Sequence, residues 1–339
     1  MRSLRAIIIS VALLAAASAV GVTAQADAAS RPPIPSVGCG TSEVEAGQHH
    51  GSMQVADSHR WWYLHVPPAH DGSTPVPLVL LFHGFPNSPD IIESQTGFGR
   101  CGTREGFVVV TPLGRGELPH WNEEEFGGGF FDATRSNADV IFIEALLDRL
   151  ETELCVDLSR VYATGFSNGA GMTSVLACAL EDRIAAAAPV GGLFDFGADC
   201  VLDRPVPLLG FHGTGDGIAL YEGGFGDWVL DVDIDGVLWR DLPMMDDPAL
   251  FVPVPDRVAG IAARNGCEPG PTSELIAEGV ERLTWTCPEG AEVAFVAAHG
   301  DGHSWPGSAY TAADGQKTTM EIDATELIWD FFEQHPMPE

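Results

Sequence analysis

The chain has 339 residues and a formal net charge of −31 at pH 7, from 48 acidic and 17 basic side chains. Such an acidic surface repels phosphate-rich partners, so we expect neither nucleic acid nor an anionic membrane to bind. The length is sufficient for one large α/β domain with a full hydrophobic core.

The N-terminal residues have the pattern of a secretory signal. Arg2 and Arg5 form a basic segment, and the apolar run at 6–16 is too short to span a bilayer. We expect residues 1–28 to be a signal peptide and residues 29–339 to form one domain. The mature protein is then secreted, or periplasmic, and monomeric. An uncleaved membrane anchor is the alternative.

Strand and helix signals alternate along the rest of the chain. Apolar, β-branched runs predict buried strands, and apolar residues at helical spacing predict helices. The predicted strands are 61–66, 78–82, 107–111, 160–164, 184–190, 206–211, 282–286 and 293–298. The predicted helices are 88–101, 137–153, 170–180 and 319–334. This alternation predicts a mostly parallel sheet covered by helices on both faces, with 61–66 antiparallel at one edge and 282–298 forming a hairpin.

The segment Gly165-Phe166-Ser167-Asn168-Gly169 lies between a predicted strand and a predicted helix. G-x-S-x-G in this context is the nucleophile elbow of α/β-hydrolases. The turn is so sharp that a Cβ before or after the serine would collide with its neighbours. The helix N-terminus behind the serine favours negative charge. We therefore predict an α/β-hydrolase fold with Ser167 as the nucleophile.

The nucleophile needs a base and an acid, which follow it in the order acid, then histidine, in this fold. Asp216 and His303 satisfy that order, and each comes just after a predicted strand. Because function gathers at the carboxyl ends of parallel strands, we expect the three side chains to meet there. The histidine would take the serine proton, and the carboxylate would hold the imidazole tautomer.

Other residues compete for these two roles. Asp301 is too close to His303 in sequence to orient it from another strand, and Asp195 and Asp227 are weaker rivals for the acid. His299 is the rival base, and it is interpreted as the end of a strand.

An oxyanion hole requires two backbone donors. The N–H of Asn168, directly after the nucleophile, is the first candidate, and the N–H of Phe85 is the second. His83 and Gly84 would shape the loop that carries Phe85. The position of His83 suits a structural hydrogen bond better than catalysis.

Seven cysteines lie outside the predicted signal, and their odd number implies at least one unpaired thiol. Export permits disulfides. We favour Cys267 with Cys287, because they flank a predicted hairpin, and we regard Cys39 with Cys101 as a weaker pairing. The pairing of the others stays open: Cys155, Cys178 and Cys200.

Several segments together resemble one family of α/β-hydrolases. They are HGF at 83–85, the Trp121-Asn122 pair, GFSNGAGM at 165–172, HGTGD at 212–216, YEGG at 221–224 and GDGHSWPG at 300–307. Together they look like the extracellular polyhydroxybutyrate depolymerase, feruloyl esterase and acetylxylan esterase family. The matching spacing runs from about residue 37 to the C-terminus.

This resemblance implies a secreted serine ester hydrolase that needs no metal or organic cofactor. It implies that Ser167, Asp216 and His303 act as the triad. Trp121 and Trp305 would border the ester-binding cleft, with His83 beside them. The substrate would be a hydroxycinnamoyl or acetyl ester of polysaccharide, or a polyester. A serine peptidase on the same fold and a non-catalytic binding protein are the alternatives.

Two segments depart from the family pattern, 123–129 and an insertion at 217–255, and both are expected to shape the mouth of the cleft. The insertion holds aromatic residues that form either a lid or platform, or a small core of their own: Phe225, Trp228, Trp239 and Phe251.

Within the insertion, Asp231, Asp233 and Asp235 match the start of a calcium-binding loop. The twelfth position of that loop is Leu242, where a bidentate glutamate is required. An acidic, exposed edge strand is the interpretation that we favour.

Overall fold

The computed structural model describes residues 31–121, 136–234, 237–310 and 315–338. The chain divides into a unit of residues 1–31 and a second compact unit of residues 32–339. The predicted signal peptide lies outside the described residues, as does the segment 123–129. Within the described ranges, no helix combines the length and the apolar character that are needed to cross a membrane.

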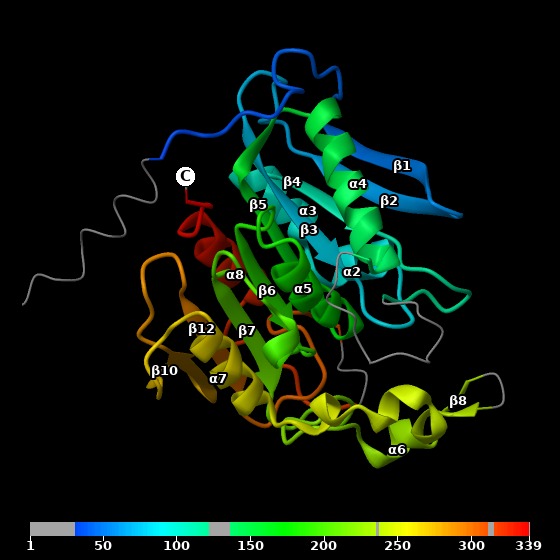
Figure 1. The fold of residues 1–339 in the computed structure, drawn as a ribbon, viewed down its shortest axis with the longest axis vertical. Helices are drawn as coiled ribbons and strands as arrows, with labels where there is room; N and C mark the ends of the chain where they lie inside the picture. The colour runs from blue at the N-terminus through cyan, green and yellow to red at the C-terminus, as the bar shows by residue number, and fades with distance from the viewer. Residues whose placement is uncertain (1–30, 122–135, 235–236, 311–314, 339) are drawn as a thin grey trace, which may run out of the picture. The chain divides into compact units, whose positions relative to one another are not determined.

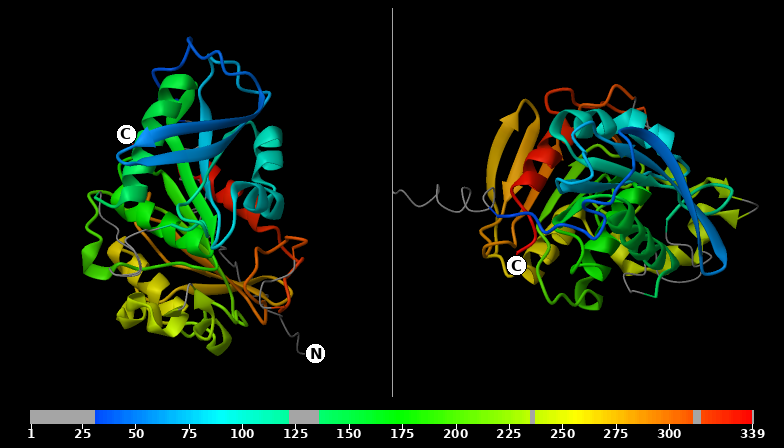
Figure 2. Two further views of the ribbon diagram at one scale, coloured as in Figure 1. Left: turned by 90° about the vertical axis from the view of Figure 1, so that its right-hand side faces the viewer. Right: turned by 90° about the horizontal axis from the view of Figure 1, so that it is seen from above.

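The described residues form a ten-stranded sheet (Figure 1). Its order is β1 (Gly47–Val55), β2 (Ser58–Val66), β4 (Val108–Pro112), β3 (Val76–Phe82), β5 (Val156–Phe166), β6 (Ala186–Val190), β7 (Leu208–Gly213), β12 (Val293–Ala298), β11 (Val280–Thr284) and β10 (Thr272–Ala277). The six strands from β4 to β12 are parallel. An antiparallel hairpin extends each edge, β1–β2 in blue and β10–β11 in orange (Figure 2).

Helices cover both faces of the sheet, as the sequence predicted. Alternate residues of β3 point to opposite sides, so Leu78 and Leu80 join one core cluster while Val79 and Leu81 join another. The first face carries α4 (Ala138–Glu153), α5 (Asn168–Ala179) and α7 (Val254–Arg264). The second carries α2 (Pro89–Thr96), α3 (Phe98–Glu105) and α8 (Ala324–Glu333).

The structure differs from the predicted elements in several places, and helix α7 is among the elements that were not predicted. The predicted helix 88–101 is interrupted at Gly97, which caps α2 in the left-handed conformation (φ 71°) and begins α3. The closing helix starts at Ala324, where the Asp323 side chain accepts hydrogen bonds from the next turn. Strands β1 and β10 were missed because they are edge strands without buried residues, and so they lack an apolar run.

Three disulfides form: Cys39–Cys155, Cys178–Cys200 and Cys267–Cys287. The favoured pair, Cys267 with Cys287, is among them. The proposed pairing of Cys39 with Cys101 is wrong. Cys101 is a free thiol on α3 that packs into the core beneath the sheet, and Cys155 is the partner of Cys39.

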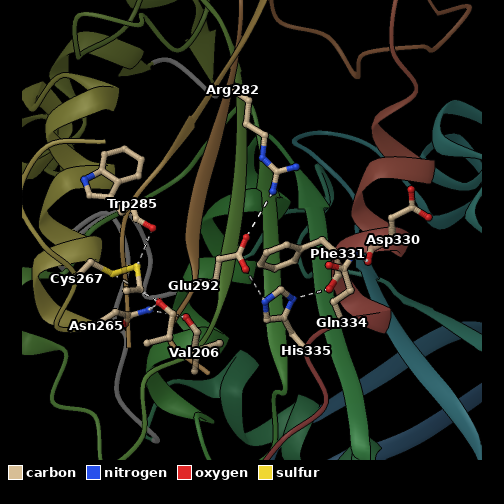
Figure 3. Close-up of polar contacts among 12 residues, drawn as sticks. Val206, Asn265, Cys267, Arg282, Trp285, Glu292, Asp330, Phe331, Gln334 and His335 are labelled. Atoms are coloured by element: carbon tan, nitrogen blue, oxygen red, sulfur yellow. Dashed lines mark hydrogen bonds and ion pairs between the residues drawn. A yellow bond between two sulfur atoms is a disulfide. The ribbon is translucent and has the colours of Figure 1, made fainter. Parts of the chain in front are cut away.

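The end of the chain is attached to the sheet beside β12. After α8, the His335 ring contacts the Phe331 carbonyl through Nδ1 and Glu292 Oε2 through Nε2, at 2.6 and 3.1 Å (Figure 3). Arg282 on β11 lies 3.5 Å from the same carboxylate. Hydrogen bonding by His335 lowers the pKa of Glu292. The Glu292 carboxylate is therefore ionised at neutral pH and forms an ion pair with the guanidinium of Arg282.

The insertion at 217–255 follows the carboxyl end of β7 (Figure 1). It contains α6 (Asp227–Leu230), the two-stranded pair β8 (Asp233–Ile234) and β9 (Val237–Leu238), and three single turns of 3₁₀-helix at Trp239–Asp241, Pro243–Asp246 and Pro248–Phe251. It therefore lies at the edge of the sheet where the predicted active site is expected.

Candidate active site

Ser167 occupies the sharp turn between β5 and α5, with φ 57° and ψ −121°. A non-glycine residue rarely adopts a positive φ, and such strain concentrates at functional sites. A Cβ on Gly165 would lie 2.5 Å from the carbonyl oxygen of Gly169, and one on Gly169 would collide with the carbonyl of Phe82. Both glycines are therefore required for the close approach of strand and helix. This geometry is that of the predicted nucleophile elbow.

The predicted acid and base are in contact. His303 Nδ1 lies 2.7 Å from Asp216 Oδ2, and the two side chains are 4% and 0% exposed. Burial raises the pKa of Asp216, but electrostatic interaction and hydrogen bonding with His303, together with a hydrogen bond from His212, hold it well below its usual value. The carboxylate is therefore ionised and can only accept. Consequently Nδ1 of His303 donates, and the lone pair lies on Nε2.

The His303 ring lies next to the nucleophile turn. Its centroid is 4.8 Å from that of Phe166, the residue before Ser167. A Cβ on Gly191 would lie 3.6 Å from His303 Cε1. The structure thus places His303 in contact with Asp216 and beside the turn that carries Ser167.

The loops that carry the acid and the base are bound to each other. The N–H of Thr214 donates to the Ala298 carbonyl at 2.9 Å, and the N–H of Gly300 donates to Thr214 Oγ1 at 2.9 Å. Asp216 Oδ1 accepts the N–H groups of Ile218 and Ala219, both at 2.9 Å. These bonds orient the carboxylate independently of the histidine.

A second histidine, His212, contacts the same carboxylate, and no role was predicted for it. Its Nε2 lies 3.2 Å from Asp216 Oδ2 and 2.8 Å from the Ala219 carbonyl, in a fully buried position at the end of β7. The spacing of four residues in the HGTGD segment was the available signal.

The rival acids and the rival base have other partners. Asp301 accepts the N–H of Thr319 and lies 3.6 Å from Lys317. Asp195 pairs with Arg264 at 2.6 Å. His299 contacts Glu281 at 3.1 Å, and Asp227 is exposed at the start of α6.

The two proposed oxyanion donors border the nucleophile. Asn168 is the first residue of α5, so its N–H has no acceptor within the helix and lies at the positive end of the helix dipole. The Asn168 side chain binds the backbone of Trp121 through both amide atoms, at 2.8 and 3.3 Å. A Cβ on Gly84 would lie 3.1 Å from Ser167 Cβ, which places the loop of Phe85 against the nucleophile.

His83 is fully buried, and its ring stabilises this loop through two hydrogen bonds. Its Nε2 accepts the N–H of Gly114 at 2.9 Å, so its Nδ1 carries the proton and donates to the Gly84 carbonyl at 2.8 Å. Burial lowers the pKa of His83 to about 4, so the ring is neutral at pH 7. The structural role was predicted, but direct contact with substrate is not compatible with complete burial.

The expected positions of the two tryptophans are corrected in the same way. The indoles of Trp121 and Trp305 are each 1% exposed. Trp121 donates through Nε1 to the His83 carbonyl, and Trp305 donates to Thr325 Oγ1 while packing against Phe98. Both rings fill the core beneath the loops, so neither offers a face to an open cleft.

An aromatic cluster joins the oxyanion loop to the insertion. The ring of Phe85 lies 5.8 Å from that of Trp239 and 6.2 Å from that of His120, and Trp239 also contacts Phe225 at 5.7 Å. Trp239 therefore both packs within the insertion and contacts the loop that carries Phe85. The other two insertion aromatics, Trp228 and Phe251, are about half exposed (52% and 51%).

The calcium prediction is only partly covered by the structure, because Asp235 lies outside the described residues. Asp231 forms an ion pair with Arg240. Among the described residues, no group of three or more His, Cys, Asp or Glu side chains is arranged to hold a metal ion.

The sheet, the elbow at Ser167 and the buried Asp216–His303 pair define an α/β-hydrolase. The fold resembles that of the solved acetyl xylan esterase from Aspergillus awamori, with a TM-score of 0.53 and 13% identity, over 84% of this chain and 99% of that one. No model of a known protein family matches the chain.

In sequence, the chain is 28% identical to feruloyl esterase B of Piromyces equi over 284 residues, which are 80% of this chain and 44% of the relative. It is 30% identical to the probable feruloyl esterase C of Aspergillus niger over 194 residues, 56% of this chain and 65% of the relative. The chain thus spans less than two thirds of the length of either relative. In sequence the chain is thus similar to feruloyl esterases, and in fold to an acetyl xylan esterase.

Proposed function

We propose that the protein is a serine carboxylic ester hydrolase that acts through an acyl-enzyme. The observation that carries this proposal is the buried contact of 2.7 Å between His303 and Asp216, beside a serine with strained backbone. Ester hydrolysis by this route requires a nucleophile, a base with a free lone pair and a fixed acid, and the three residues offer these.

The steps follow from the proton positions. Nε2 of His303 takes the proton of Ser167 as Oγ attacks the ester carbonyl, and the imidazolium then protonates the departing alcohol. Water hydrolyses the resulting acyl-serine with the same histidine as base. Asp216 stays ionised throughout, because its low pKa disfavours protonation. The N–H groups of Asn168 and Phe85 stabilise the negative oxygen in both steps.

We propose acylated polysaccharide as the substrate, with hydroxycinnamoyl or acetyl groups. The similar proteins, a feruloyl esterase and an acetyl xylan esterase, support this choice. A polyhydroxyalkanoate-type polyester is the second candidate, because the sequence resemblance includes polyester depolymerases.

We further propose that the protein is exported after removal of residues 1–28 and that residues 29–339 form one catalytic domain with an insertion at 217–255. The three disulfides support an oxidising compartment, since such bonds rarely persist in the cytosol.

Parallel assays on methyl ferulate, acetylated xylan and a polyhydroxybutyrate suspension test the proposal, with Ser167→Ala as the inactive control. We expect release of ferulate or acetate that the control lacks. Equal rates in the control would contradict the mechanism. Cleavage of peptides but not esters would favour a peptidase, and failure to react with a fluorophosphonate probe would favour a non-catalytic protein.

A further inference from the structure

The outer face of the β1–β2 hairpin carries a row of aromatic rings. On β2, alternate residues share this face, and they are His59, Trp61, Tyr63 and His65. Trp61 is 52% exposed and its ring lies 4.7 Å from that of His59. The cross-strand neighbour His50 lies 4.1 Å from Tyr63. The opposite face of the hairpin, with Trp62 and Leu64, packs into the core. An exposed row of this kind on an otherwise acidic protein indicates a binding surface.

The row leads into a cavity of about 300 Å³ between the hairpin and α2–α3. Its lining includes both ring-bearing and polar residues, among them Gln48, His50, Tyr63, His65, Glu93 and Arg100. The Tyr63 hydroxyl donates to Asp90 at 3.2 Å. The carboxylate of Glu93 is held by Thr111 Oγ1 at 2.8 Å and by the N–H of Gly99 at 3.0 Å. Aromatic rings combined with polar groups in fixed positions are typical of a ligand site.

The charged residues that line the cavity indicate which kind of ligand can bind there. Asp90 and Glu93 disfavour an anionic polymer, and Arg100 is the single Lys or Arg among the lining residues that the structure describes. A carboxylate oxygen can accept more than one hydrogen bond, so the hydroxyl groups of a sugar can donate to Asp90 beside Tyr63. A polyester offers acceptors alone and cannot make such a bond. The C–H faces of sugar rings pack against aromatic rings, which combine a large apolar surface with a polar handle.

The row also points toward the active-site edge of the sheet. Because β2 runs antiparallel to β4, the Trp61 end of β2 lies at the carboxyl edge of the parallel strands, where Trp62 is opposite Pro112, the last residue of β4. In the sheet order, β2 is three strand spacings from β5, which ends before Ser167, or roughly 14 Å. A chain lying along the row would thus reach toward the nucleophile from the cavity.

We propose that the outer face of β1–β2 and the adjoining cavity form a second binding site, for a neutral polysaccharide chain, distinct from the site of ester cleavage. Binding at this site does not depend on catalysis. Its use in holding acylated polymer near Ser167 rests on the function proposed above.

The test measures binding of the inactive full chain. Ser167→Ala is incubated with insoluble neutral arabinoxylan, the protein left in solution is quantified, and migration in gels that contain soluble arabinoxylan gives an independent affinity. Adding Trp61→Ala should weaken binding about three- to tenfold, which is the effect of losing one well-packed aromatic contact. The matched control is Leu275→Ala on β10, an exposed side chain (72%) in the hairpin at the other edge of the sheet, which should bind like the parent.

Equal binding with and without Trp61, at unchanged melting temperature, would overturn the proposal. So would the absence of any xylan binding, or retention by a polyhydroxybutyrate film in place of xylan. In the active chain, Trp61→Ala should lower the rate on acetylated xylan relative to the rate on p-nitrophenyl acetate. If the active chain cleaves no ester but binding still depends on Trp61, the proposed function fails and the binding site stands.

Discussion

His303 Nδ1 lies 2.7 Å from Asp216 Oδ2, although the two residues are 87 positions apart in the chain. The contact forms because β7 and β12 are neighbours in the sheet and run parallel, so the loops after them emerge side by side. Thr214 and Gly300 join the two loops by a further hydrogen bond. His303, the proposed base, is therefore oriented before any substrate arrives, and such an arrangement would lower the cost of proton transfer.

Replacing Asp216 by asparagine should lower kcat by about 10⁴-fold, because the amide lets the imidazole adopt the wrong tautomer. The measurement is the steady-state rate on p-nitrophenyl acetate, with the melting temperature recorded in parallel. Asp195→Asn is the control, since that carboxylate pairs with Arg264 away from the base, and its kcat should not change. A rate for Asp216→Asn close to the parent would show that another acid orients His303.

His212 should act as a positioning residue for the same carboxylate. Removing its Nε2–H with His212→Leu takes one charge-assisted hydrogen bond from Asp216, and such a bond contributes about 1.5–3 kcal/mol. We expect kcat to fall at least tenfold in His212→Leu and to be largely retained in His212→Gln, whose amide can donate from a similar position. A purely structural role would instead lower the melting temperature of both variants and leave kcat of the folded protein unchanged.

The lowered pKa of His83 predicts that the stability of the protein depends on pH. Its pKa is lowered to about 4 by burial, below the ordinary value of 6.5, so the unfolded chain binds the proton more tightly between these values. The stability that neutral His83 contributes is full above pH 6.5 and is lost as the pH falls toward 4. For a shift of this size the loss approaches roughly 3 kcal/mol.

Urea unfolding of the parent and of His83→Gln, repeated between pH 7 and pH 4.5, isolates this contribution from that of the carboxylates. The difference in unfolding free energy between the two proteins should shrink as the pH falls. A difference that stays constant across this range would mean that His83 does not titrate with folding.

The sequence could reveal the order in which the proposed nucleophile, acid and base follow one another along the chain. Ser167, Asp216 and His303 each follow an apolar run that ends abruptly, and parallel strands bring such ends to one edge. The two glycines of the elbow were informative because their role is steric and local. Strands at the edge of the sheet, such as β1, were not predicted because they bury few side chains and carry no apolar run.

Other features of the structure depend on long-range packing, which could not be predicted from the sequence. The partner of Cys39 depends on how the segment before β1 returns to the start of β5, and nothing local to either cysteine indicates it. Trp305 follows His303, the proposed catalytic histidine, closely, yet its ring turns into the core against Phe98. Sequence proximity to a catalytic residue therefore did not indicate contact with substrate.

Trp239 offers the sharpest test of which ester the site prefers. Its ring lies 5.8 Å from that of Phe85, the residue that carries one proposed oxyanion donor. We therefore expect a bulky aromatic acyl group, but not an acetyl group, to contact it. Trp239→Ala should raise KM for methyl ferulate about tenfold, since a buried aromatic contact contributes on the order of 1 kcal/mol beyond its area. KM for p-nitrophenyl acetate should change little.

Phe251→Ala is the matched control for Trp239→Ala, because Phe251 belongs to the same insertion and is half exposed. It should leave the ratio of the two KM values unchanged. If Trp239→Ala weakens both esters equally, the insertion stabilises the oxyanion loop without choosing the acyl group. If it weakens neither, Trp239 serves the packing of the insertion around Phe225, and selection of the acyl group lies elsewhere.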